Sequence, residues 1–411
     1  MRRAKTLLLS LVLSLGAAPA IAQSALSDPD VMELHDRLLT IDTHIDIGPG
    51  YGTNALDPGV LNLAQVNLPG MRIGGLDAGF FVVYAQQGAL TPDGYKAAEA
   101  AAEEKYRGIV RMLRANPDKI ALATTASEVK AINRKGKLVA LIGIENSYPL
   151  GSTPAEVETA VAKWAARGAL YASITHFGHN QFGGSSNPVA ERGDGEDAGL
   201  TDLGRVLVAS LNDHGMMVDV SHVGAASVAD AIEASRAPVI ASHSTVAGVY
   251  DNPRGLTDAQ LEAIRDNGGV AQITAFRSYI GDVDPRIEEA IGALRARLGL
   301  TSYAAYVAAS PATLSEFARE RTRIRREFDD ITLDQFLDHV ERAIAVAGID
   351  HVGLSGDFDG GGGVAGWDSA ADSPNVTAGL LARGYSEEDL EKIWGGNVLR
   401  VMRAVEKAAT K

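Results

Sequence analysis

Histidine and acidic residues close several apolar runs of this chain. The run LLTIDTHIDI over 38–47 carries His44 and Asp46 two residues apart near its end. Side chains alternate across a strand, so this pair would project from one side of it. An imidazole and a carboxylate side by side are a pair of metal ligands. One such pair is a weak signal, but five further runs close in the same way, with Glu145, His176, His222, His243 and Asp357.

The apolar runs predict the elements that would position these residues. We expect strands over 38–46, 76–84, 138–145, 168–176, 216–222, 238–243, 268–275 and 351–357, with amphipathic helices between most of them. Near-continuous apolar strands separated by helices are typical of parallel sheets. Eight such units favour a (β/α)8 TIM-type barrel. A doubly wound open sheet is the competing fold, but HIDIGPGYG lacks its G-x-G-x-x-G order.

A barrel would bring the polar strand ends to one place, because every parallel strand presents its C-terminal end to the same face. The chain has no Cys, so a metal there would be held by nitrogen and oxygen atoms, which suits Zn²⁺, Mn²⁺ or Co²⁺. Four or five ligands exceed the three that one open catalytic zinc site takes. The surplus predicts two metals sharing a carboxylate, and Glu145 is the predicted bridge because no strand end carries Lys.

The other polar residues receive simpler interpretations. His35, His214 and His339 lie within predicted helices and are expected at the surface, whereas His351 opens the eighth strand at the wrong end for chemistry. His179 lies in a loop, and its role stays open. We expect Asp42 to orient His44, and Asp359 to do the same for the loop after the eighth strand.

Composition and the first residues predict an exported protein. The chain has 411 residues, 46% of them apolar, and a net charge of −14, which argues against nucleic acid or an anionic membrane as partner. Residues 1–22 have the basic start, short apolar run and small-residue cleavage site of a signal peptide, with cleavage expected after Ala22. Loss of the three basic residues in this segment would shift the net charge to −17. The mature protein is expected to be one domain over 23–411, without a membrane anchor, and to be periplasmic or secreted.

Three segments interrupt the alternation of strands and helices. Residues 277–330 form a predicted helical insertion between the seventh and eighth strands, whose Arg/Glu run is read as a solvated helix face, with a cap or subunit contact as the alternative. The loop over 177–199 and the glycine run that begins at Gly360 are either lids or solvated connections.

The motifs together resemble the renal (membrane) dipeptidase family of zinc metallopeptidases. The resemblance is carried, from about residue 33 to 405, by IDTHID, IGIEN, SITHFGHN, DVSHV, APVIASHS, NPRGLTD, VGLSGDFDG and GGNVLRV. It implies an amidohydrolase-like barrel with two Zn²⁺ ions, Mn²⁺ or Co²⁺ being alternatives. By this resemblance His44 and Asp46 hold one ion, His222 and His243 hold the other, and Glu145 bridges both.

The resemblance also implies the roles of the remaining residues. His176 would polarise the substrate, Arg254 would bind its carboxylate, and Asp357 would handle the proton. The implied activity is an exported dipeptidase that cleaves L-Xaa-L-Xaa and also L-Xaa-D-Xaa peptides through a metal-bridging hydroxide. Asn146 stands where many members have glycine, and the cysteines and lipid anchor of animal members are absent, as in a bacterial exported form.

Two rival functions stay open, and so does a homodimeric state. The first is another amide or ester hydrolase on the same binuclear barrel, such as an N-acyl amino acid or lactone hydrolase. The second is an exported metal- or solute-binding protein without catalysis. Because Asp357 and His176 exceed what two metals need as ligands, they favour an enzyme.

Overall fold

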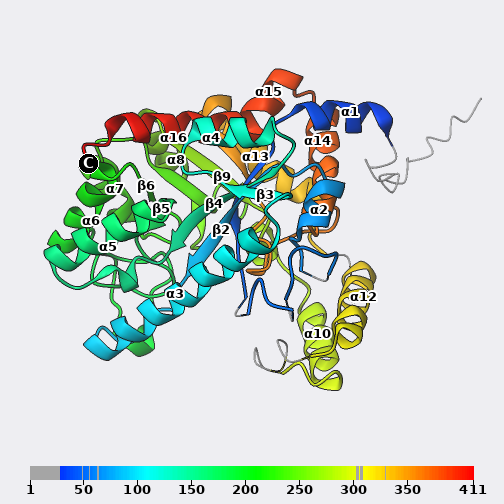
Figure 1. The fold of residues 1–411 in the computed structure, drawn as a ribbon, viewed down its shortest axis with the longest axis horizontal. Coiled ribbons are helices and arrows are strands. Elements are labelled where there is room, and N and C mark those ends of the chain that lie inside the picture. Colours follow the sequence, from blue (N-terminus) through cyan, green and yellow to red (C-terminus); the bar gives the residue numbers. More distant parts are fainter. Residues whose placement is uncertain are drawn as a thin grey trace, which may run out of the picture.

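A parallel sheet curls around the centre of the molecule in the computed structural model, which describes residues 28–48, 50–54, 56–62, 64–301, 305, 309–328 and 330–411 (Figure 1). The strands follow the order β1-β2-β4-β5-β6-β7-β9-β10. A bridge between Ile45 and Phe358 joins the last strand to the first, and the Asp46 N–H donates to the Phe358 carbonyl at 2.9 Å. The sheet is therefore nearly closed, which confirms the predicted eight-stranded barrel.

All eight predicted strands are present. They are β1 (Ile41–Ile45), β2 (Ala78–Tyr84), β4 (Leu138–Glu145), β5 (Ala169–Ser173), β6 (Met217–Asp219), β7 (Ile240–Val246), β9 (Val270–Thr274) and β10 (Val352–Ser355). Two short strands were not predicted: β3 (Ile120–Leu122) pairs with β4, and β8 (Gly255–Leu256) pairs with β7. Both flank the barrel path and leave its order unchanged.

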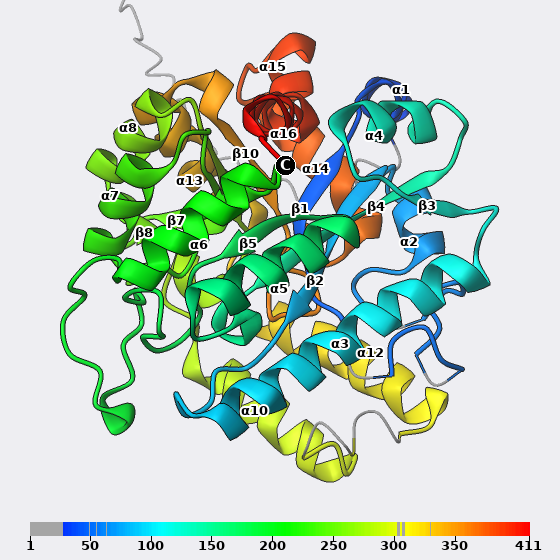
Figure 2. The ribbon, with the colours of Figure 1, turned by 60° about the vertical axis from the view of Figure 1, so that its left-hand side comes forward.

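Helices cover the outside of the barrel, as Figure 2 shows for α3, α5 and α6. The helices before the insertion are α1 (Pro29–Arg37), α2 (Leu68–Ile73), α3 (Pro92–Ala115), α4 (Ala126–Asn133), α5 (Pro154–Ala166), α6 (Asp202–Asp213), α7 (Ala225–Ala234) and α8 (Asp258–Asp266). Those after it are α13 (Leu333–Ala347), α14 (Ser373–Ala382), α15 (Glu387–Glu391) and α16 (Asn397–Ala408). A threonine hydroxyl caps α3, α4, α5, α6, α8 and α13 by accepting a backbone N–H of the first turn.

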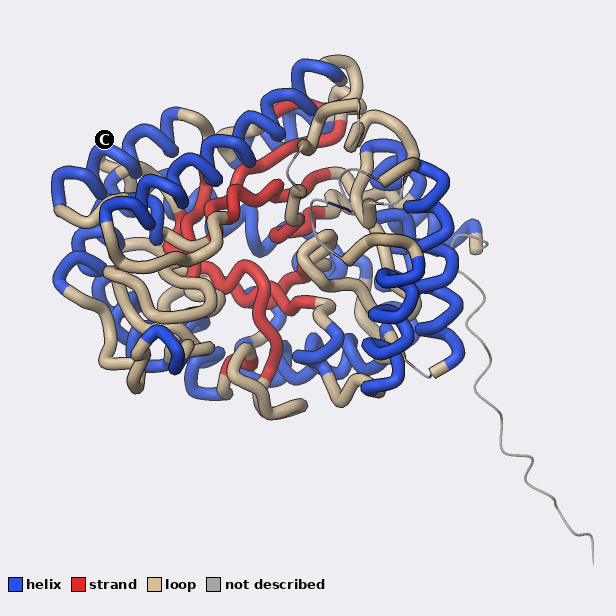
Figure 3. Tube along the Cα trace, turned by 90° about the horizontal axis from the view of Figure 1, so that it is seen from below, coloured by secondary structure: helices blue, strands red, loops and turns tan. Residues whose placement is uncertain are grey.

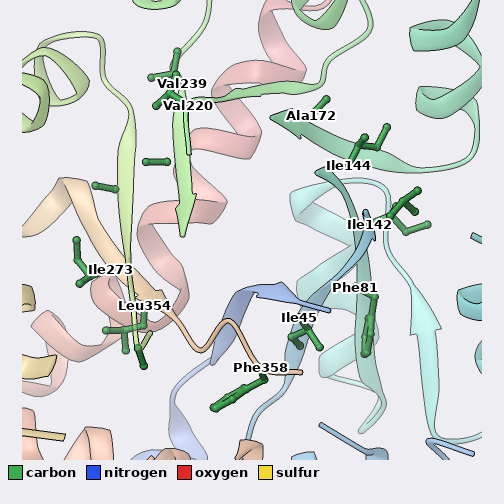
Figure 4. Packing of buried hydrophobic residues seen from close by; sticks show 14 of the residues in the cluster. Ile45, Phe81, Ile142, Ile144, Ala172, Val220, Val239, Ile273, Leu354 and Phe358 are labelled. Carbon is green, nitrogen blue, oxygen red and sulfur yellow. The ribbon is translucent and has the colours of Figure 1, made fainter. Parts of the chain in front are cut away.

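The apolar core has two main parts. One lies between strands and outer helices, where Figure 4 shows strand residues such as Phe81, Ile142 and Ile144. The other joins strand residues such as Val139 to the apolar side of α16. Figure 1 shows α16 across the end of the barrel at which the strands begin. The opposite end, where the strands finish, is therefore the end left for a site.

The predicted insertion between the seventh and eighth barrel strands is confirmed. It contains α9 (Arg277–Ile280), α10 (Pro285–Arg297) and α12 (Pro311–Glu327). The last two share a small apolar core that includes Ile291, Leu294 and Phe317. Figure 1 shows them on the side toward which the strands run, and Figure 3 shows the ring of strands from that side.

The predicted signal peptide, residues 1–22, lies outside the described residues. Among the helices that the structure describes, none is both long enough and apolar enough to cross a bilayer.

Candidate metal centre

The C-terminal ends of six barrel strands bring the predicted site residues together. Glu145 is the last residue of β4, and His243 lies inside β7. Three strands end slightly earlier than predicted, so that His176, His222 and Asp357 stand two or three residues beyond β5, β6 and β10. The chemistry is thus carried by short loops anchored directly on the rigid barrel.

Glu145 lies at the centre of this cluster. Its Oε1 is 3.2 Å from His222 Nε2, 3.3 Å from His243 Nε2 and 3.7 Å from His176 Nε2. Its Oε2 is 3.5 Å from His44 Nε2. The His44 Nε2 is in turn 3.6 Å from Asp46 Oδ2. Two oxygens of one carboxylate therefore face two different sets of side chains.

These separations fit a cation better than direct hydrogen bonds. Two ligand atoms about 2.1 Å from a tetrahedral ion lie about 3.4 Å apart. Three overlapping groups of ligand atoms lie within 4.8 Å of one another: His44–Glu145–His243, Glu145–His176–His222 and His44–Asp46–Asp357. The donor set contains only nitrogen and oxygen, as expected for Zn²⁺, Mn²⁺ or Co²⁺. The residues present thus fit metal binding, although the groups cross the predicted division into two ligand sets.

Protonation favours metal binding by two of the imidazoles. Burial holds the pKa values of His222 and His243 well below the usual value, so both are neutral near pH 7 and keep a free lone pair. Burial would also lower the pKa of His44, but Glu145 and Asp46 outweigh it and hold that pKa well above the usual value. A cation bound by His44 would have to displace this proton.

Asp357 is a buried carboxylic acid beside the cluster. Burial raises its pKa to about 7; Asp46 and Glu145 act in the same direction and His44 opposes them. A group that titrates near neutral pH can both accept and return a proton. Gly360 packs closely against both acids: a Cβ there would lie 2.4 Å from Asp357 Oδ1 and 2.3 Å from Asp46 Oδ2, so these carboxylates would have to shift.

The backbone is strained around this cluster. In the described residues four non-glycine positions have positive φ, namely Asn146 (70°), His222 (65°), Asp357 (49°) and Asp359 (63°). All four follow barrel strands at the site end. Left-handed conformations cost energy for such residues and gather at functional sites. The positive φ of Asn146 suits asparagine, which tolerates the left-handed region better than most residues.

Arg254 is a buried cation next to the cluster. One of its terminal nitrogens donates to the His243 carbonyl at 2.7 Å, while its Nε finds no hydrogen-bond partner in the described structure. No ion pair joins Arg254 to an acid in the described residues. Together with His222 it lines a cavity of about 270 Å³. Asp357 and Glu145 act on this charge from a distance, but a buried guanidinium without a direct carboxylate partner is costly, so this position suits an anionic ligand.

His176 is surrounded by aromatic rings. Its ring centroid is 4.8 Å from that of Tyr84 and 4.4 Å from that of Phe177. Burial lowers its pKa, so a neutral ring with one N–H faces the cluster. The sequence interpretation overlooked Tyr84, although a tyrosine that ends the apolar run over 76–84 was a usable signal.

The supporting residues differ partly from expectation. Asp42 accepts the backbone N–H of His44 at 3.0 Å and that of Gly356 at 3.1 Å, so it orders the strand end and not the imidazole. Asp359 accepts the backbone N–H groups of Gln65 and Val66, and thereby fixes the loop after β1 instead of its own.

The prediction that His35 and His339 lie at the surface is wrong. His35 is buried, with Nδ1 2.7 Å from Thr377 Oγ1 and Nε2 3.0 Å from the Gly74 carbonyl. His339 is buried too, and its Nδ1 accepts the Val246 N–H at 3.2 Å. His179 stabilises its own loop by accepting the Ser185 N–H at 2.9 Å. Each is a satisfied polar residue outside the Glu145 cluster.

Comparisons with known proteins identify relatives of this chain. The family model described as membrane dipeptidase, peptidase family M19, matches residues 30–411. The Dipeptidase verJ of Clonostachys rogersoniana is 30% identical over 295 residues, which are 72% of this chain and 62% of that protein. The chain thus matches less than two thirds of that relative's length.

Solved structures have the same fold. The probable dipeptidase PvdM from Pseudomonas aeruginosa has a TM-score of 0.79 and 30% identity, covering 92% of this chain and 98% of that one. A metallo peptidase from Rhodobacter sphaeroides, liganded with a phosphinate mimic of the dipeptide L-Ala-D-Ala, has a TM-score of 0.66 and 22% identity, covering 90% and 99%. With the family match, these findings show that the chain belongs to the membrane dipeptidase family, peptidase family M19.

Proposed function

We propose that this protein is a metallodipeptidase that hydrolyses the peptide bond of free dipeptides. The observation that carries the proposal is the buried Arg254, which has no acidic partner in the described residues and lies beside a cluster able to hold metal. A guanidinium can bind the free carboxylate of a short peptide through two parallel hydrogen bonds. Because a longer peptide has an amide at that point, this receptor restricts the substrate to two residues.

The proposed centre holds two Zn²⁺ ions, with Mn²⁺ or Co²⁺ as alternatives. His44 and Asp46 would bind one ion, His222 and His243 the other, and Glu145 both. The two oxygens of Glu145 support this division, since one faces His44 and the other faces His222 and His243. When bound, such a pair would supply an activated, hydroxide-like water and polarise the peptide carbonyl.

The protein's own side chains would then direct the reaction. The neutral His176 donates its N–H to the carbonyl oxygen, where negative charge develops and a fixed donor helps most. Asp357 takes a proton from the attacking water and returns it to the leaving amine, as its pKa of about 7 allows. Arg254 holds the carboxylate and so fixes the distance to the scissile bond.

We include L-Xaa-D-Xaa dipeptides among the proposed substrates. The structure from Rhodobacter sphaeroides, which binds a mimic of L-Ala-D-Ala, supports their inclusion. The carboxylate receptor accounts for dipeptides better than for lactones, which have no free carboxylate. An N-acyl amino acid has the same carboxylate as a dipeptide, so the two differ only at the amino end. The alternative hydrolase remains a distinct outcome of the experiment below.

Export is a separate part of the proposal. We infer that residues 1–22 direct the chain out of the cytoplasm and are removed after Ala22. Mass spectrometry of the protein recovered from its producing cells would test this: the expected first residue is Gln23, and an intact Met1 would contradict it.

One experiment tests the activity. The purified enzyme is assayed for metal content and for turnover of L-Ala-L-Ala, L-Ala-D-Ala and N-acetyl-L-Ala-L-Ala. We expect close to two ions per chain, hydrolysis of the free dipeptides and little hydrolysis of the acetylated peptide. Preference for the acetylated peptide would favour the N-acyl hydrolase, and metal binding without any turnover would favour a binding protein.

A further inference from the structure

The three predicted imidazole ligands differ in what holds the ring nitrogen that faces away from Glu145. His44 Nδ1 is 3.1 Å from the Tyr171 hydroxyl, and His243 Nδ1 is 2.8 Å from Ser242 Oγ. His222 Nδ1 has no hydrogen-bond partner in the described structure, and His222 is one of the residues that line the cavity shared with Arg254. The second nitrogen matters because its partner fixes the tautomer and orientation of a metal-binding ring.

Behind Ser242 stands a carboxylate that the proposed reaction does not use. Asp219 is fully buried at the end of β6, and its Oδ2 accepts the Ser242 hydroxyl at 2.6 Å. Its Oδ1 accepts the backbone N–H groups of Ser221 at 3.0 Å and Ser242 at 2.9 Å. The Ser221 hydroxyl in turn accepts the His243 N–H at 2.9 Å. Asp219 therefore organises both the backbone and the side chains around His243.

The direction of these hydrogen bonds follows from the number of hydrogens. Ser242 has one hydroxyl hydrogen and gives it to Asp219, so toward His243 it can only accept. The His243 Nδ1 must then carry the hydrogen, which leaves the Nε2 lone pair pointing toward Glu145. That is the tautomer in which Nε2 can bind a metal.

We propose that Asp219 and Ser242 are positioning residues that hold His243 in its metal-binding tautomer. This inference rests on the metal centre of the proposed function. Tyr171 is the corresponding residue on the other side: its hydroxyl donates to the Thr43 carbonyl at 3.0 Å and so accepts from His44 Nδ1. Its ring approaches the sheet closely, since a Cβ at Gly143 would lie 2.1 Å from Tyr171 Cζ.

The hydrogen-bond chain from Asp219 through Ser242 to His243, here called the relay, predicts the effect of an isosteric change. In Asp219→Asn the amide oxygen can accept both backbone N–H groups, which leaves the NH₂ group facing Ser242. The NH₂ then donates to Ser242, whose hydroxyl must turn toward His243 and donate to Nδ1. His243 is driven into the wrong tautomer without any change in side-chain volume.

Metal binding by the whole enzyme tests the relay. Zinc affinity and stoichiometry are measured by competition with a chromophoric chelator, and the cobalt-loaded enzyme gives an absorption spectrum that reports ligand geometry. We expect Ser242→Ala and Asp219→Asn to lower the affinity for one of the two ions by about 10–100-fold and to alter the cobalt spectrum. Ser242→Thr keeps the hydroxyl and should restore both.

Ser227→Ala is the matched control, because Ser227 is also buried and its hydroxyl donates to Asp197 at 2.6 Å, away from the imidazoles. It should leave both ions in place. Wild-type affinity in Ser242→Ala, or failure of Ser242→Thr to restore what Ser242→Ala loses, would overturn the relay. A wild-type enzyme that binds no metal would instead overturn the proposed function. Should Asp219→Asn fail to fold, the two Ser242 variants still decide.

Discussion

Two buried arginines at the C-terminal end of the barrel have opposite surroundings. Arg277, at the start of α9, donates to Asp330 at 2.6 Å and to Asp368 at 2.8 Å, and Arg325 also donates to Asp368 at 2.8 Å. In this network every cation has an acid within hydrogen-bond distance. Arg254, only 3% exposed, has a backbone carbonyl and the Tyr279 ring beside it but no carboxylate in the described residues.

The acids of the two regions differ in the same way. Burial would raise the pKa of Asp368, but Arg325 and Arg277 outweigh it and hold that pKa below the usual value. Beside the Glu145 cluster, at the mouth of the barrel where the strands end, burial prevails and raises the pKa of Asp357 to about 7.

A buried network whose charges pair directly stabilises a fold. The Glu145 cluster instead leaves its carboxylate 3.2 to 3.7 Å from the imidazoles of His222 and His176, beside Arg254, which has no ion pair in the described residues, and this arrangement suits ligands. In this molecule, direct ion pairs therefore distinguish the charged residues that stabilise the fold from those arranged to bind a ligand.

The largest effect is expected from Glu145→Ala. It removes the carboxylate that all four imidazoles face, so both proposed ions would lose a ligand and the imidazoles would keep no common partner. We expect metal content to fall with dipeptide hydrolysis, which should drop by roughly 1000-fold or more because the site acts as a unit. Glu103→Ala is the control, since Glu103 lies on α3 outside the barrel and pairs with Lys163 and Arg167. A Glu145→Ala enzyme with two ions and wild-type turnover would erase the distinction between the two networks.

Asp357→Asn should come next. It removes the group proposed to carry the proton but keeps its shape, so we expect kcat to fall by about 100- to 1000-fold with KM and metal content little changed. Asp359→Asn is a matched control, because Asp359 follows the same strand and has a pKa raised to about 6, but its carboxylate accepts the backbone N–H groups of Gln65 and Val66. Loss of metal in parallel with kcat would make Asp357 a ligand instead.

Arg254 and Arg277 can be compared directly by replacing each with methionine. Arg254→Met should raise KM for dipeptides by about 10- to 100-fold, the worth of charge-assisted hydrogen bonds, and leave KM for a dipeptide amide unchanged. Arg277→Met should leave KM unchanged but lower the free energy of unfolding by about 3–5 kcal/mol, because it leaves the buried carboxylate of Asp330 without this partner. Unchanged dipeptide affinity in Arg254→Met would contradict the carboxylate receptor.

The sequence predicted the barrel because its signal was repeated. Eight apolar runs separated by helical segments, six of them with a histidine or acidic residue near the end, agree on one topology even where single boundaries are wrong. β3 and β8 were missed because strands of three and two residues contain too few side chains to show a period.

Some residues of the site could be predicted from the sequence, whereas others become visible only in the fold. Residues that interrupt an apolar run, such as Glu145 and His243, stand out in the sequence. Tyr171 and Asp219 lie within apolar runs as ordinary strand residues, and only the fold shows their hydroxyl and carboxylate behind the imidazoles. His35 looked exposed because its helix neighbours are polar, and its buried partner Thr377 is far along the chain. Arg325, read as part of a solvated face, likewise pairs with the distant Asp368.

The smallest effect on catalysis is expected at Asp368, whose side chain is 28% exposed. Asp368→Asn should lower the free energy of unfolding at pH 7 by about 1–3 kcal/mol, less than for a fully buried pair, and leave turnover per folded molecule unchanged. Because Arg325 and Arg277 hold its folded pKa below the unfolded value of about 3.9, its contribution is present above pH 4 and is lost as the pH falls through the folded pKa. Urea unfolding between pH 3 and pH 7 should therefore show wild type and variant converging at the acidic end. Parallel curves would mean that Asp368 is not held by the arginines, and a fall in turnover would mean that this network also serves the mouth of the barrel.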